Sequence, residues 1–164
     1  MQKLISIRHL VEMTATGTIF REISNWFDLL VDYFGLSQSA KVLIRFWDGT
    51  KILLRSNSTD RWSIHEVMLR NDYAFMPPSG DNPVIIDLGV GEGAFSVFAA
   101  KRTPNAQIIA LEPDEKNFKL AQENIRINNL SKQVIILKCV CSDKDGKAPL
   151  YTASDRRAHS MIRK

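Results

Sequence analysis

The chain has 164 residues, 45% of them hydrophobic, which is enough to bury the core of one domain plus an appendage. Its net charge of +4 comes from mostly scattered basic residues that are not interleaved with aromatic side chains, so we expect no nucleic-acid partner. The sequence shows neither an apolar run of about eighteen residues nor a signal-peptide pattern, so we expect a cytoplasmic protein without a membrane span.

Residues 1–36 are predicted to be helical. From Thr18 onward, apolar side chains recur every three or four residues, which predicts one continuous helix that ends at Gly35. The apolar positions are Ile19, Ile23, Trp26, Phe27, Leu30 and Phe34, and the expected solvated positions are Glu22, Asp28 and Asp32. We expect the apolar face to pack on the rest of the protein or on a second subunit.

Residues 41–56 are predicted to form a β-hairpin, because apolar and polar residues alternate on both sides of Asp48-Gly49. This dipeptide favours a two-residue type I′ turn. A short helix over 61–70 and a turn-rich linker over 76–83 should follow. We therefore divide the chain into a helical segment (1–36), a hairpin with a short helix (37–82) and a partial cofactor-binding domain (83–164).

The last of these segments alternates strand, helix, strand, helix and strand. Continuous apolar strands separated by helices are typical of a parallel sheet. The strands are expected near 84–87, 106–113 and 134–140, and the helices near 94–101 and 115–129. The predicted fold class is α/β, a Rossmann-like parallel sheet of about three core strands preceded by a helix and a hairpin.

The strongest functional signal follows the first of these strands. The strand ends in Asp87, and three glycines come next at alternate positions, where a backbone can turn sharply and approach a ligand. These glycines are Gly89, Gly91 and Gly93, with Val90 and Glu92 between them. The loop predicts a site for a nucleotide-like cofactor at the start of a helix.

Two cofactors fit this loop. A carboxylate at Asp87 would attract the ammonium and sulfonium region of S-adenosylmethionine and would repel a pyrophosphate, which favours S-adenosylmethionine. Gly89, Gly91 and Ala94 also match the fingerprint of NAD(P)-binding proteins, so an oxidoreductase domain is the alternative. Alternatively, Asp87 only caps the turn and the glycines only allow tight packing.

A second acid, Glu112, ends the next predicted strand. In a βαβ unit its carboxylate lies beside the first strand, where it can accept hydrogen bonds from both ribose hydroxyls of either cofactor. Pro113 should end the strand, and Asp114 should cap the following helix. A solvated carboxylate at a strand end is the alternative reading of Glu112.

Other candidate residues carry less information. Cys139 and Cys141 lie two apart on the third predicted strand, so they should share a face, form no unstrained disulfide and be small buried core residues. No His or acid lies nearby at ligand spacing, so we expect no metal site. The three histidines are dispersed, and the sequence identifies no catalytic base.

The chain resembles the FkbM-type methyltransferases, which belong to the class I S-adenosylmethionine-dependent enzymes. The likeness covers about residues 41–160. It lies in the glycine loop (84–96), the second strand end (109–114), the segment 140–160 with its Ser-Asp-Lys-Asp-Gly turn, and upstream motifs at 45–49, 58–60, 64–66 and 71–73. The resemblance implies methyl transfer from S-adenosylmethionine to oxygen acceptors on small molecules or sugars.

The resemblance also implies roles for individual residues. Asp87 and the glycine loop would shape the methionine and ribose end of the pocket, and Glu112 would hold the ribose. The residues near the adenine would be Pro113, Val140, Cys141 and Ser142. Family members continue through further strands and a Lys-Ile-Asp-x-Glu-Gly-like segment that this sequence does not match. We therefore expect a fragment that is inactive alone and associates through its helix or open sheet edge; a partner chain or a non-catalytic module is the alternative.

Overall fold

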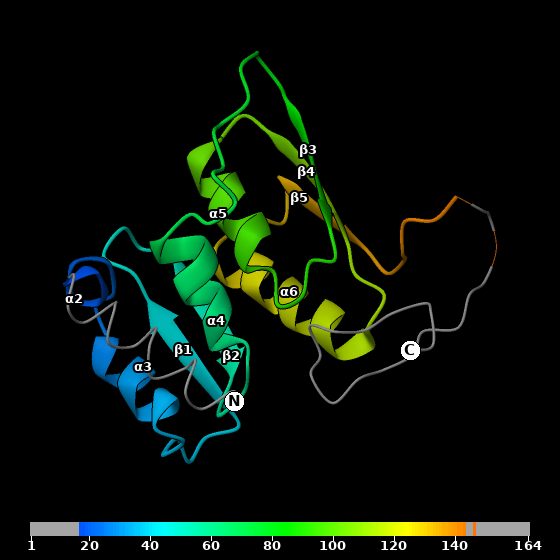
Figure 1. Ribbon diagram of the computed structural model, residues 1–164. Helices are drawn as coiled ribbons and strands as arrows, with labels where there is room; N and C mark the ends of the chain where they lie inside the picture. The colour runs from blue at the N-terminus through cyan, green and yellow to red at the C-terminus, as the bar shows by residue number, and fades with distance from the viewer. Residues whose placement is uncertain (1–16, 144–145, 147–164) are drawn as a thin grey trace. The chain divides into compact units, whose positions relative to one another are not determined.

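The computed structural model describes residues 17–143 and 146 (Figure 1). The chain separates into two compact units, Met1–Phe75 and Met76–Lys164. The first sixteen residues of the predicted N-terminal helix lie outside the described residues, as do residues 144–145 and 147–160 of the family-like segment. Among the helices of the described residues, none combines the length and the apolar character that a membrane crossing requires.

The predicted continuous helix is wrong, because two short helices occur, α2 (Thr18–Glu22) and α3 (Trp26–Tyr33). They separate at Ile23, whose backbone is extended and forms a bridge with Phe46 of the hairpin. The break shifts the helical face, so Asp32 is fully buried instead of solvated, whereas Phe27 and Phe34 are exposed. The buried Asp32 carboxylate accepts the Asn57 N–H at 2.6 Å and pairs with Arg61 at 3.3 Å.

The predicted stop at Gly35 is confirmed. Gly35 has a φ of 72°, and its N–H bonds the Asp32 carbonyl, while the Leu36 N–H bonds the Val31 carbonyl. This pair of bonds is the Schellman arrangement, which satisfies carbonyl groups at the end of a helix.

The predicted hairpin is present as β1 (Lys41–Arg45) and β2 (Lys51–Arg55), with Ile44 opposite Ile52. The expected type I′ turn at Asp48-Gly49 is wrong. A type I′ turn needs a positive φ at both central residues, but only Gly49 has one (84°). The Gly49 N–H bonds the Phe46 carbonyl and the Phe46 N–H bonds the Thr50 carbonyl, which leaves a three-residue loop with glycine at its left-handed position.

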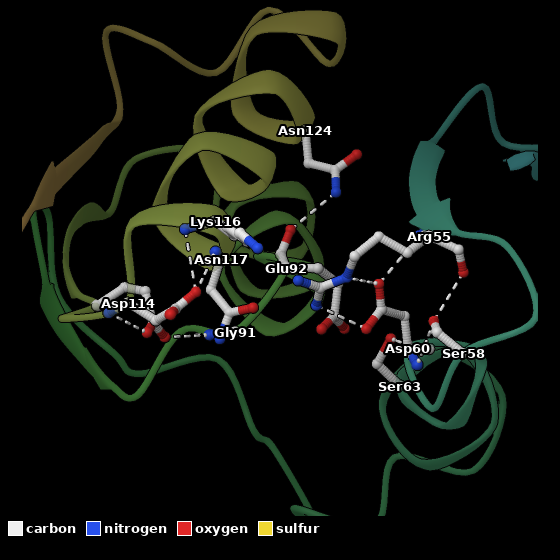
Figure 2. Close-up of polar contacts among 11 residues, drawn as sticks. Arg55, Ser58, Asp60, Ser63, Gly91, Glu92, Asp114, Lys116, Asn117 and Asn124 are labelled. Carbon is white, nitrogen blue, oxygen red and sulfur yellow. Dashed lines mark hydrogen bonds and ion pairs between the residues drawn. The ribbon is translucent and has the colours of Figure 1, made fainter. Parts of the chain in front are cut away.

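The short helix after the hairpin consists of α4 (Arg61–Ser63) and a π-helical stretch, η1 (Ile64–Leu69). Its start is fixed by Asp60, whose buried carboxylate accepts two hydrogen bonds of 2.7 Å from the Arg55 guanidinium (Figure 2). Ser63 donates to the Asp60 carbonyl at 2.7 Å. The helix is thus tied to the end of β2.

The second unit contains the predicted parallel sheet, so the predicted fold class is confirmed. Its strands are β3 (Val84–Leu88), β4 (Gln107–Leu111) and β5 (Val134–Leu137), in the order β3-β4-β5. The connecting helices are α5 (Ala94–Arg102) and α6 (Glu115–Ile127). They pack on each other, with α5 against β4 and α6 against β5. The carboxyl ends of the strands therefore lie side by side at one edge of the sheet.

The third strand is shorter than predicted and ends at Leu137. The Cys139 N–H bonds the Leu137 carbonyl at 3.0 Å, so the chain turns out of the ladder before it reaches either cysteine. Cys139 and Cys141 are consequently exposed free thiols, and the prediction that they are buried on a strand is wrong.

One face of the sheet presents apolar side chains to solvent. Register places every second residue of the three strands on this face. Its most exposed members are Val84 (59%), Ile86 (62%), Leu88 (57%), Ile135 (49%) and Leu137 (45%). A contiguous apolar surface of this kind attracts partners.

We expect the 164-residue chain to self-associate through this face. Light scattering at increasing protein concentration should show a rising apparent mass, and Ile86→Lys should reduce it because a charge then occupies the middle of the surface. Lys101→Ala, on the exposed side of α5, is the matched control and should leave association unchanged. A wild-type chain that stays monomeric at every concentration would contradict this expectation.

Candidate cofactor-binding site

The glycine loop connects β3 to α5 at the carboxyl edge of the sheet. Gly89, Gly91 and Gly93 have φ values of 79°, 60° and 90°, in the region that disfavours side chains. An added Cβ at Gly93 would lie 3.1 Å from the Cα of Ala121, so this glycine lets α6 approach the loop. At Gly89 and Gly91 no atom of the described residues beyond the two chain neighbours lies within 4 Å of an added Cβ, which leaves open space beside the loop.

Four backbone N–H groups of this loop donate hydrogen bonds within the protein. Those of Gly89 and Val90 donate to the Leu111 carbonyl at 2.9 and 3.2 Å, and that of Gly93 donates to Val90 at 3.0 Å. The Gly91 N–H donates to the Glu112 carboxylate at 2.8 Å. The loop is therefore tied to the end of β4 and is held in one conformation.

Glu112 lies immediately after β4 and is 4% exposed. One of its oxygens accepts the Gly91 N–H, and the other accepts the Asp114 N–H at 2.9 Å. Asp114 in turn caps α6, as predicted, because its side chain accepts the N–H groups of Lys116 and Asn117 at 3.0 and 2.9 Å (Figure 2). Glu112 thus joins the glycine loop to the turn that begins α6.

A third connection comes from Asn124 of α6, which is fully buried. Its amide donates to the Glu92 carbonyl at 2.8 Å, and Figure 2 shows it pointing from the helix to the loop. A buried carbonyl without a partner costs about 1–3 kcal/mol, so this bond fixes the far side of the loop.

Asp87 lies at the carboxyl end of β3, and its side chain is buried, with 9% of its surface exposed. The Ser96 hydroxyl, from the first turn of α5, donates to its Oδ2 at 2.6 Å. The sheet edge therefore carries two buried carboxylates, Asp87 and Glu112, next to a rigid loop with open space beside it.

Part of the chain is similar to known methyltransferases. Residues 74–149 match the family described as Methyltransferase small domain. The chain is 33% identical over 79 residues to Methyltransferase sdnD of Sordaria araneosa, covering 48% of this chain and 29% of that protein. It is 52% identical over 40 residues to a tRNA1(Val) (adenine(37)-N6)-methyltransferase of Glaesserella parasuis, covering 24% of this chain and 17% of that protein. The fold matches P. horikoshii TYW2 in complex with MeSAdo, with a TM-score of 0.52 and 22% identity. The match covers 68% of this chain and 40% of that chain.

By sequence, residues 74–149 are similar to class I S-adenosylmethionine-dependent methyltransferase domains, and the solved structure supports the fold alone. The cofactor of this part of the chain is S-adenosyl-L-methionine, as for other domains of this kind. The chain spans less than a third of the length of either curated relative.

The electrostatics of the methyltransferase domain suit a cationic ligand. Burial raises the pKa of Asp87 above its ordinary value of 3.8, the Ser96 hydroxyl opposes this shift, and the nearby Glu112 carboxylate adds to it. A positive group placed between the two acids would relieve both the desolvation and the repulsion. The residues present therefore fit the ammonium and sulfonium groups of the cofactor. Among the described residues no cluster of three or more metal-binding side chains occurs.

The remaining predicted site residues are distributed around this edge. Pro113 is half-buried beside Glu112, whereas Val140, Cys141 and Ser142 are exposed and follow the end of β5. The Ser142 hydroxyl donates to the Asp143 carboxylate at 3.3 Å. The position of the last three residues near an adenine ring stays a prediction.

Sequence reasoning missed two residues of the methyltransferase domain. Ser96 interrupts an otherwise apolar first turn of α5, and Asn124 lies on the same helical face as Ala121 and Ile125. A small polar residue on a buried face usually has a specific hydrogen-bond partner, and that signal would have identified both.

Proposed function

We propose that this chain supplies the cofactor-binding part of a methyltransferase that acts on a hydroxyl group of a small molecule or a sugar. The observation that carries the cofactor site is the pair of buried carboxylates, Asp87 and Glu112, beside the open glycine loop. The oxygen acceptor and membership of the FkbM type rest on the sequence likeness over residues 41–160.

In this proposal each residue has a defined role. Asp87 attracts the ammonium end of the cofactor. Glu112 accepts hydrogen bonds from the ribose hydroxyls, using the oxygen lone pairs that are not occupied by the Gly91 and Asp114 N–H groups. The loop residues form the floor of the pocket: Gly89, Val90, Gly91, Glu92 and Gly93. The residues proposed to border the adenine are Pro113, Val140, Cys141 and Ser142. When bound, the cofactor supplies a methyl group activated by its sulfonium, so the protein mainly aligns donor and acceptor.

The backbone of the loop argues against the NAD(P) alternative. A pyrophosphate is usually bound by N–H groups of such a loop. Here the N–H groups of Gly89, Val90, Gly91 and Gly93 bond to the protein, and the acceptor for Gly91 is itself a carboxylate. A pyrophosphate at this position would meet negative charge instead of donors.

Ligand-induced stabilisation tests the choice of cofactor. We expect S-adenosylhomocysteine to raise the melting temperature, because a ligand at a hundredfold its dissociation constant adds about 2.7 kcal/mol of stability. NADH and NADPH at the same concentration should leave the melting temperature unchanged. Stabilisation by NADH or NADPH alone would favour the oxidoreductase reading.

The acceptor requires a separate assay with the complete reading frame that contains this chain. Labelled methyl should be transferred to hydroxylated small molecules or sugars in a panel that also contains tRNA, ribosomal RNA and protein. Transfer only to RNA or protein would contradict the acceptor, and cofactor binding without any transfer would favour a non-catalytic module.

A further inference from the structure

The first turn of α5 places a buried hydroxyl on the carboxylate that ends β3. Ser96 is fully buried, Asp87 is 9% exposed, and the donor–acceptor distance is 2.6 Å. Such a short bond from a hydroxyl to a carboxylate is typical of an ionised acceptor. The hydroxyl engages only Oδ2, so the second oxygen of the carboxylate remains for another positive or hydrogen-bonding group.

From this geometry we infer that Ser96 is a positioning residue, which orients the Asp87 carboxylate and keeps it ionised so that it can bind the cationic amino-acid end of the cofactor. This inference rests on the proposed role of Asp87 in the cofactor site. Ser96 itself need not touch the cofactor, because it acts through Asp87.

The surroundings explain why such a residue is needed. The groups that act on the Asp87 carboxyl are Ser96 from α5 and Glu112 from the end of β4. Burial and the Glu112 charge both favour the protonated form of Asp87, and among the described residues only the Ser96 hydroxyl favours the ionised form. Without that hydroxyl, the pKa of Asp87 would rise further, and the carboxylate would bind a cation only at higher pH.

The test uses calorimetry with S-adenosylhomocysteine on the full chain at several pH values between about 5 and 8. Ser96→Ala should bind about tenfold more weakly at the lower pH values, and its loss of affinity with falling pH should begin at a higher pH than in the wild type. Titration of the Asp87 carboxyl carbon by NMR should show the same displacement of its pKa.

A double-mutant cycle separates this role from a merely structural one. In the Asp87→Asn background no charge remains to be stabilised, so adding Ser96→Ala should change the affinity little. An equal loss in both backgrounds, or an unchanged pH profile in Ser96→Ala, would overturn the inference while leaving the cofactor site intact. A wild-type chain that does not bind S-adenosylhomocysteine would overturn the cofactor site and the inference together.

Discussion

Gly91→Val should abolish binding of S-adenosylhomocysteine while leaving the secondary structure intact. Gly91 has a φ of 60°, and no atom of the described residues beyond its chain neighbours lies within 4 Å of an added Cβ, so the new side chain would project into the proposed pocket. A β-branched residue at positive φ also costs about 1–3 kcal/mol of strain, which would displace the N–H that bonds Glu112. Calorimetry measures the affinity, and circular dichroism checks the fold.

The matched control is Gly49→Val in the hairpin turn. Gly49 has a φ of 84° and equally open space beside it, but it belongs to the first compact unit. This variant should lose a similar amount of stability and keep its affinity for S-adenosylhomocysteine. If Gly91→Val bound the ligand as tightly as the wild type, the loop would not be the cofactor site.

The strand and helix order of the second unit could be predicted because its signals are local. Continuous apolar strands, the positive-φ glycines and the Asp114 cap each depend on a few neighbouring residues. The junction of β3 with its loop and the end of β4 at Glu112 were therefore placed correctly.

The errors occurred where distant contacts override local patterns. The helical spacing continues through Ile23, yet this residue bridges to Phe46 of the hairpin and so breaks the helix. Asp32 looked solvated because its partners, Asn57 and Arg61, are distant in sequence. The apolar stretch into Cys139 looked like a longer strand, but the chain turns after Leu137.

In the site, too, local signals could be predicted from the sequence, whereas contacts between distant residues could not. The carboxylates Asp87 and Glu112 were identifiable from their positions at strand ends. Their partners Ser96 and Gly91 could not be paired with them from sequence, since the distances depend on how α5 and the loop pack on the sheet. This difference matters for mutagenesis, because Glu112 holds the glycine loop and the start of α6 in place and is also the proposed ribose acceptor.

Glu112→Ala should weaken binding of S-adenosylhomocysteine by roughly 2–4 kcal/mol, since two ribose hydroxyls lose a charged acceptor. Calorimetry gives this value directly. Asp114→Ala is the control, because its side chain caps the first turn of α6. It should cost about 1 kcal/mol of stability and little affinity. If the two variants exchanged these effects, the ribose would be held by Asp114.

Glu112 also anchors the Gly91 and Asp114 N–H groups, so a loss of affinity in Glu112→Ala has two possible origins. The 2′-deoxyribose analogue of S-adenosylhomocysteine distinguishes them. If Glu112 binds the ribose, removing the hydroxyl should weaken binding to the wild type by about 1.5–3 kcal/mol and should cost little in Glu112→Ala. An equal penalty in both proteins would mean that Glu112 only holds the loop and that another group recognises the ribose.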